Sequence, residues 1–181
     1  KVMSNLLYSE KVLKLVTAHY SNEDSLPDKY VAAFLQNRKH LAGLNLCRQL
    51  YHSDLDLVLH LRKDFWWDLV KEYYKKYHVF EMDKKDTHLC SFTPIFSGEW
   101  GGAYYSNVWS DVLAADVYSA FWEANQTQND ADFLEVGKRF RNTFLTYGGT
   151  LSMSEVFRRF RGRDPSPKAL LKSLALSEPK K

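Results

Sequence analysis

The sequence predicts an all-α fold with little strand, and three observations support this. Apolar residues recur at the three- and four-residue spacing of amphipathic helices through most of the 181 residues. Prolines and glycines fall at several points where this spacing is interrupted, as expected at helix ends. The hydrophobic content of 45% is enough to form a core. We therefore expect residues 1–181 to form a single helical segment.

The first part of the chain predicts a helix over residues 9–20 and further helix up to about His60. The apolar face of the first helix is expected to carry Val12, Leu15, Val16 and His19. Pro27 suits the first turn of the next helix because its fixed φ is helical. From there the pattern fits one long helix or two abutting ones, and Gly43 marks close packing or a bend.

The middle of the chain predicts two helices separated by irregular segments. Residues 65–77 form an aromatic-rich helix, and residues 81–88 form a charged surface loop. Residues 89–96 are expected to be a short extended piece that leads into a glycine-rich loop at 97–102. Residues 104–122 give the strongest helical pattern of the chain.

The last third predicts two helices with well-defined ends. A helix over 132–145 should stop before Gly148 and Gly149, because glycine favours the C-terminal end of a helix. Ser152 with Glu155 three residues later predicts the capped start of the next helix, which should end at Gly162.

The C-terminal end predicts a short helix from residue 166 to about residue 174, followed by a frayed tail at 178–181. Basic residues gather before it, but they alternate with phenylalanines, as on amphipathic helices with a solvated basic face. With a net charge of only +3, we expect no nucleic-acid partner. The basic residues are Lys138, Arg139, Arg141, Arg158, Arg159, Arg161 and Arg163.

Cysteine usage and hydropathy point to a cytoplasmic or mitochondrial-matrix protein. Cys47 and Cys90 alone make no disulfide framework, which suits a reducing compartment. The sequence has no apolar run of about 18 residues and no signal peptide, so we expect no membrane partner. The chain starts at Lys1, so we expect it to be processed or to be a piece of a longer protein.

No catalytic or metal-ligating residue is assigned in this chain, because no HExxH, P-loop, GxSxG or Rossmann motif is present. His52, Asp56 and His60 share one helix face, and such a trio can bind a metal. The simpler interpretation is a polar stripe on a long helix.

The glycine-rich loop is the candidate ligand site, since glycines let a backbone approach a ligand closely. It leads into Tyr104 and Tyr105, whose hydroxyls can lie over a cleft. An ordinary loop followed by a core helix is the alternative.

Taken in order, several segments resemble the thimet oligopeptidase and neurolysin family of zinc metallopeptidases, which includes bacterial oligopeptidase A. The resemblance covers essentially the whole chain. The matching residues include Ser91-Phe92, the glycine-rich loop, Tyr104-Tyr105-Ser106, Trp109-Ser110-Asp111-Val112, Ala115-Asp116-Val117, Gly137 to Asn142, Gly148-Gly149 and Phe160 to Pro165.

This resemblance implies a mostly helical, two-lobed peptidase in which one zinc, bound by HExxH and a later Glu, helps to cleave short peptides. It places this chain after the third zinc ligand, in the helical C-terminal part of the zincin-type catalytic lobe, within a larger peptidase-like domain. We therefore expect no cofactor in this chain, and zinc only if an upstream HExxH segment is present. The expected partners are short peptides, or the missing peptidase portion or another partner protein chain.

The resemblance also implies that the loop contacts substrate, with Tyr104, Tyr105, Gly101, Gly102 and Trp100 as the substrate-binding residues. The family has a His where this chain has Pro94, and tyrosines where it has Trp100 and Asn107. These changes remove hydrogen-bond donors that would stabilise an oxyanion. We therefore expect the chain alone to be inactive. It is either a segment of a zinc oligopeptidase or a non-catalytic homologue that acts as a binding or structural subunit. An unrelated helical adaptor is the third possibility.

Overall fold

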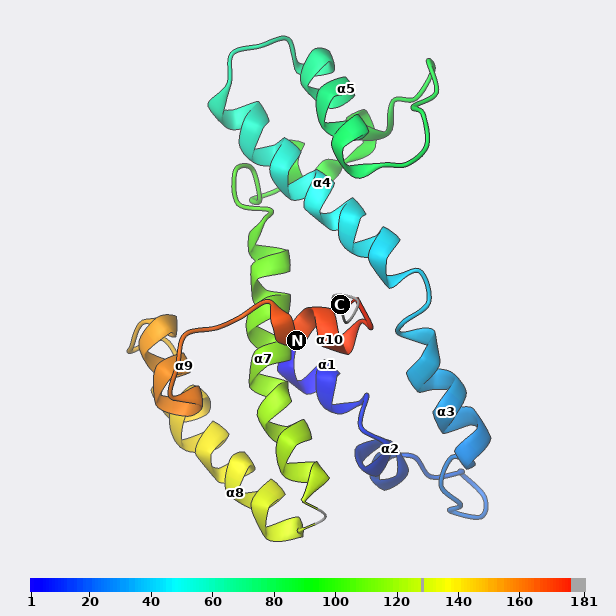
Figure 1. The fold of residues 1–181 in the computed structure, drawn as a ribbon, viewed down its shortest axis with the longest axis vertical. Helices are drawn as coiled ribbons and strands as arrows, with labels where there is room; N and C mark the ends of the chain where they lie inside the picture. The colour runs from blue at the N-terminus through cyan, green and yellow to red at the C-terminus, as the bar shows by residue number, and fades with distance from the viewer. Residues whose placement is uncertain (128, 177–181) are drawn as a thin grey trace, which may run out of the picture. The chain divides into compact units, whose positions relative to one another are not determined.

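A computed structural model describes residues 1–127 and 129–176, and these residues form helices and connecting segments without a strand, which confirms the all-α prediction. The helices, drawn in Figure 1, are α1 (Val2–Leu6), α2 (Glu10–Val16), α3 (Asp28–Asn37), α4 (Ala42–Leu61), α5 (Trp66–Tyr77), α6 (Thr93–Phe96), α7 (Ser106–Gln126), α8 (Asp130–Phe140), α9 (Met153–Arg161) and α10 (Lys168–Ser173). Within these residues, no helix is both long and apolar enough to cross a bilayer.

The chain divides into two compact units. Residues 41–110 form one, here called the inserted unit, and residues 1–40 with 111–181 form the other, here called the terminal unit. The inserted unit is continuous in sequence, whereas the terminal unit is assembled from both ends of the chain.

The inserted unit is built on α4 and α5, which pack side by side (Figure 1). Both helices are amphipathic, and their apolar faces meet in a core completed by the segment after α5. Tyr51 lies in this core with its hydroxyl 2.8 Å from His88 Nε2, so its polar end has a partner. The buried core residues are Tyr51, Leu55, Val58, Leu69, Val70, Leu89 and Ile95.

The core of the terminal unit lies among α7, α8 and α9. Phenylalanine rings supply much of it, and the Phe140 and Phe160 rings meet edge to face at 6.0 Å between centroids. Its buried residues are Val117, Ala120, Phe121, Ala124, Val136, Phe157 and Phe160.

Several helices begin or end at residues whose chemistry the sequence indicates as a helix boundary. Ser152 Oγ accepts a hydrogen bond from the Glu155 N–H at 3.3 Å, which caps α9. α9 ends at Gly162, as predicted. Of the two arrangements left open for residues 27–60, two helices form, because Leu41 adopts a left-handed φ of 51° between α3 and α4.

Two local predictions were wrong. The helix predicted over 9–20 spans only Glu10–Val16, and it buries Leu13, while Leu15 and Val16 are exposed. The segment 89–96 is not extended: it forms a 3₁₀ turn at His88–Ser91 followed by α6. The predicted frayed tail at 178–181 lies outside the described residues.

Candidate functional site

The glycine-rich loop lies between α6 and the start of α7, within the inserted unit. Successive turns shape it, with the Ala103 N–H bonded to the Trp100 carbonyl at 2.9 Å and the Ser106 N–H bonded to the Ala103 carbonyl at 3.0 Å. The loop therefore has a defined backbone path into α7.

A buried carboxylate on α4 anchors this loop. Asp56 is fully buried, and its Oδ1 accepts the Gly102 N–H at 2.9 Å while its Oδ2 accepts the Tyr104 N–H at 3.0 Å. A carboxylate removed from water is strongly destabilising unless such donors satisfy it. Asp56 and the loop thus stabilise each other, and the side chains that follow Gly102 start from a fixed backbone.

Two of the loop glycines are required by geometry. Gly102 has a φ of +72°, which is costly for residues with a Cβ. A Cβ on Gly98 would lie 2.9 Å from the Pro94 carbonyl oxygen, closer than real contacts allow. The loop conformation is therefore specific to these glycines.

His60 lies against the same loop from α4. A Cβ on Gly101 would lie 3.1 Å from His60 Nε2, so the ring and the backbone are in close contact. His60 Nδ1 lies 2.8 Å from the carbonyl oxygen of Asp56. Because that oxygen can only accept, Nδ1 carries the proton.

The predicted substrate-binding residues differ in exposure. The Tyr104 ring is half-buried, edge-on to Phe92 at 5.1 Å and to His52 at 6.1 Å between centroids. The Tyr105 and Trp100 side chains are about half exposed, at 48% and 47%. Their rings are open to a ligand, while Tyr104 also packs against the core of the inserted unit.

Pro94, Trp100 and Asn107, where the resemblance implies other residues, all lie in the segment from α6 to the start of α7. Pro94 lies in the first turn of α6. N–H groups in the first turn of a helix have no partner within the helix, so the helix loses no hydrogen bond through proline's missing N–H. The Asn107 side-chain amide donates to the Tyr104 carbonyl at 3.2 Å, at the start of α7. This contact directs the Asn107 amide to the loop backbone.

His52, Asp56 and His60 do not form a metal site. The His52 ring stacks on Phe92 at 4.2 Å, and both Asp56 oxygens accept backbone N–H groups. Burial, with the nearby charge of Arg48, lowers the pKa of His52 to about 4. Across residues 1–127 and 129–176, no three His, Cys, Asp or Glu side chains converge to bind a metal ion. These three side chains are therefore not arranged as zinc ligands, and the family resemblance places the zinc ligands upstream of this chain.

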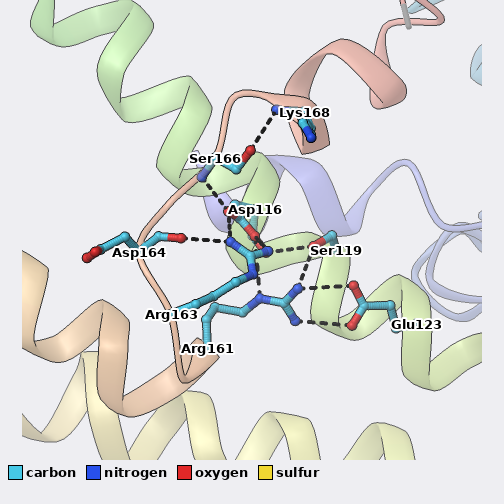
Figure 2. Close-up of polar contacts among 8 residues, drawn as sticks. All are labelled: Asp116, Ser119, Glu123, Arg161, Arg163, Asp164, Ser166 and Lys168. Atoms are coloured by element: carbon cyan, nitrogen blue, oxygen red, sulfur yellow. Dashed lines mark hydrogen bonds and ion pairs between the residues drawn. The ribbon is translucent and has the colours of Figure 1, made fainter.

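Asp116 on α7 is a second fully buried carboxylate, and its role was missed by the sequence reasoning (Figure 2). Arg163 binds it through two hydrogen bonds, Nη2 to Oδ1 at 2.6 Å and Nη1 to Oδ2 at 2.7 Å. The Ser166 N–H donates to Oδ2 at 2.8 Å, and Arg161 Nε lies 3.4 Å from Oδ1. This cluster connects α7 to the segment between α9 and α10.

The electrostatics of Asp116 follow from these contacts. Burial alone raises the pKa of its carboxyl, but the hydrogen bonds from Arg163 and Ser166, with the charge of Arg161, lower it below the ordinary value. The signal in the sequence was an aspartate among apolar core residues of a helix. The same signal was present at Asp56, which the sequence analysis assigned to a polar stripe.

Comparison with known proteins agrees with this structure. The family model described as peptidase family M3 matches residues 1–176. The organellar oligopeptidase A of Arabidopsis thaliana, named as chloroplastic/mitochondrial, is 37% identical over 175 residues, which are 94% of this chain and 22% of that protein. Oligopeptidase A of Haemophilus influenzae is 32% identical over 94% of this chain and 25% of its own length. Saccharolysin of Saccharomyces cerevisiae is 24% identical over 89% and 23%.

The chain thus spans about a quarter of the length of the curated relatives it matches. The family match extends over almost all of the chain, including both buried carboxylates and the glycine-rich loop. The chain belongs to peptidase family M3.

Proposed function

We propose that this chain is the C-terminal part of a zinc oligopeptidase that cleaves short peptides, and that it is not catalytically complete alone. Its contribution is the substrate loop of residues 97–105. The observation that carries the proposal is the anchoring of this loop by Asp56 within a chain of family M3. A backbone fixed in advance lets the loop bind an extended peptide without first being ordered.

In this proposal the loop supplies binding and orientation. The exposed rings of Trp100 and Tyr105 contact the side chains of a peptide, and Tyr104 contacts it through its hydroxyl. Gly101 and Gly102 let the peptide approach the backbone closely. The metal and the groups that activate water belong to a segment outside this chain, so no chemical step is assigned to residues 1–181.

A chimera tests the proposal. Residues 1–176 replace the matching quarter of Haemophilus influenzae oligopeptidase A, and cleavage of a quenched fluorescent peptide is measured with and without a chelator. We expect chelator-sensitive cleavage by the chimera and none by the chain alone. A folded chimera without activity would contradict the proposal.

The alternative is a non-catalytic homologue that acts as a binding or structural subunit of a larger assembly. The substitutions at Pro94, Trp100 and Asn107 favour it, because losing one oxyanion donor typically costs about 10²- to 10³-fold in rate. Under this alternative, the chimera is inactive and Pro94→His, Trp100→Tyr and Asn107→Tyr together restore turnover. Trp109→Tyr, at an exposed tryptophan outside the three positions, is the control and should restore nothing.

The remaining proposals concern partners and location. We propose that a covalently joined or separate peptidase portion is the protein partner, since the matched relatives are about four times longer. We also propose a cytoplasmic or mitochondrial-matrix location. Two relatives from Arabidopsis thaliana, named as organellar and as cytosolic oligopeptidase A, support this choice.

A further inference from the structure

The terminal unit contains a pocket of about 570 Å³ that is separate from the glycine-rich loop. It is lined by Tyr8 and Arg163 and by residues from α3 and the turn after it, from α7 and from α10. Its volume lies in the usual range for small-molecule sites. Its apolar lining residues include Leu35, Ala115, Tyr118 and Trp122, so part of a ligand can be removed from water there.

The pocket carries a net positive charge after the charges that form ion pairs with one another are set aside. Glu123 is the one acidic residue among the lining side chains, and Arg161 neutralises it through hydrogen bonds of 3.0 and 3.1 Å (Figure 2). Arg163 also lines the pocket, but Asp116 neutralises it in turn. Because these two ion pairs are neutral, the net charge of the pocket is set by its other cations.

Four cations remain: Arg38, Lys39, Lys168 and Lys172. Among the described residues, no carboxylate forms an ion pair with any of them. Arg38 and Lys39 lie in the turn after α3, whereas Lys168 and Lys172 lie on α10, so the fold brings together residues that are far apart in sequence. The charge of Asp111 acts on Arg38 without forming an ion pair with it. Four cations without an ion-paired carboxylate suit a ligand with more than one negative charge.

Arg38 is the most informative of the four. Its guanidinium lies 4.0 Å from the Tyr8 ring centre, and its Nη2 donates to Asn5 Oδ1 at 2.5 Å. Burial lowers its pKa, so it is a partly desolvated cation. A guanidinium has five N–H donors, and the described residues accept from one nitrogen, which leaves donors for a ligand.

A second cation, Lys172, has its Nζ 4.3 Å from the Trp122 ring centre. The pocket therefore has two aromatic rings that each lie next to a cation. A flat ring can pack against these aromatic groups and against Leu35, while negatively charged groups pair with the cations.

We propose that this pocket binds a small polyanion attached to a flat ring, the chemistry of a nucleoside diphosphate. The inference is independent of the proposed peptidase function, since it uses different residues in a different unit.

Isothermal titration of the full 181-residue chain with ADP tests the proposal, with adenosine and inorganic pyrophosphate as separate probes. We expect saturable 1:1 binding of ADP with a dissociation constant below about 1 mM. Each half of the ligand alone should bind at least about tenfold more weakly, because it uses only the aromatic contacts or only the cations.

Lys172→Gln should weaken ADP binding about fivefold or more, since it removes one cation from the pocket. Lys138→Gln is the matched control, because Lys138 is an exposed lysine on α8 outside the pocket and its loss changes the net charge equally. Arg38→Gln should weaken binding further, with circular dichroism to verify that the helices remain. The proposal is wrong if ADP shows no saturable binding, if pyrophosphate binds as tightly as ADP, or if Lys138→Gln and Lys172→Gln weaken binding equally.

Discussion

Replacing Asp56 with asparagine should loosen the glycine-rich loop while leaving α4 itself intact. Asparagine has nearly the same shape, but one carboxylate oxygen becomes an NH₂ group that faces a backbone N–H. One of the two hydrogen bonds, to Gly102 or to Tyr104, is then lost and two donors meet in a buried site. A hydrogen bond to a charged group contributes about 1.5–3 kcal/mol, and an unsatisfied buried donor adds to the loss. We expect the free energy of unfolding of the inserted unit to fall by about 2–4 kcal/mol.

Urea denaturation followed by tryptophan fluorescence measures this change. The signal reports mainly on the inserted unit, which holds Trp66, Trp67, Trp100 and Trp109 of the chain's five tryptophans. Asp68→Asn is the control, since it alters an exposed ion pair and should cost less than about 1 kcal/mol.

Hydrogen exchange locates the effect within the unit. In the Asp56→Asn protein, the Gly102 and Tyr104 amides should exchange at least about 30-fold faster, as 2 kcal/mol requires. The amide of Val70, in the core on α5, should change only as much as global stability does. Unchanged exchange at Gly102 and Tyr104, together with a loss below 1 kcal/mol, would refute the anchoring role of Asp56.

Three further substitutions test other parts of the structure. Arg163→Lys should lower the free energy of unfolding by about 1–3 kcal/mol, because lysine cannot form both hydrogen bonds to Asp116; an unchanged urea midpoint would contradict this. The pKa of His52 is about 4 in the folded protein and about 6.5 when unfolded, so stability is complete above pH 6.5 and falls by about 2 kcal/mol by pH 5. His52→Phe keeps a stacked ring and should remove the part of the stability loss between pH 7 and pH 5 that His52 causes. An equal stability loss in both proteins would show that other groups cause the loss. Gly98→Ala should lower the melting temperature and Gly149→Ala should not, since a Cβ meets a carbonyl oxygen at 2.9 Å in the first case and nothing within 4 Å in the second.

Much of the fold could be predicted because the local signals agree with the final packing. The Ser152 cap and the Gly162 stop lie at the two ends of α9, where the sequence placed them. The pattern failed in 9–20, where several faces of a short helix carry apolar residues. Leu13 is buried while Leu15 is exposed, and tertiary contacts rather than periodicity decide between them.

The site was predicted only in part, since its geometry depends on contacts between residues far apart in sequence. The glycine-rich loop was recognisable from its composition. Its anchor was not recognisable, because Asp56 lies 46 positions before Gly102. Asp56 is also four residues from both His52 and His60, and this spacing indicated a polar stripe on one helix face instead. The Asp116 cluster was missed for the same reason, since 47 positions separate it from Arg163.

The 47-residue separation of Asp116 and Arg163 affects the order in which the two units fold during synthesis. The inserted unit consists of continuous sequence and can fold as soon as residue 110 has left the ribosome. The terminal unit has no such option, because Asp116 would be a buried charge without its counter-ion until Arg163 is also available. We therefore expect a nascent chain that ends before Arg163 to contain a folded inserted unit and an unfolded terminal unit, which can fold only after Arg163 has been synthesised.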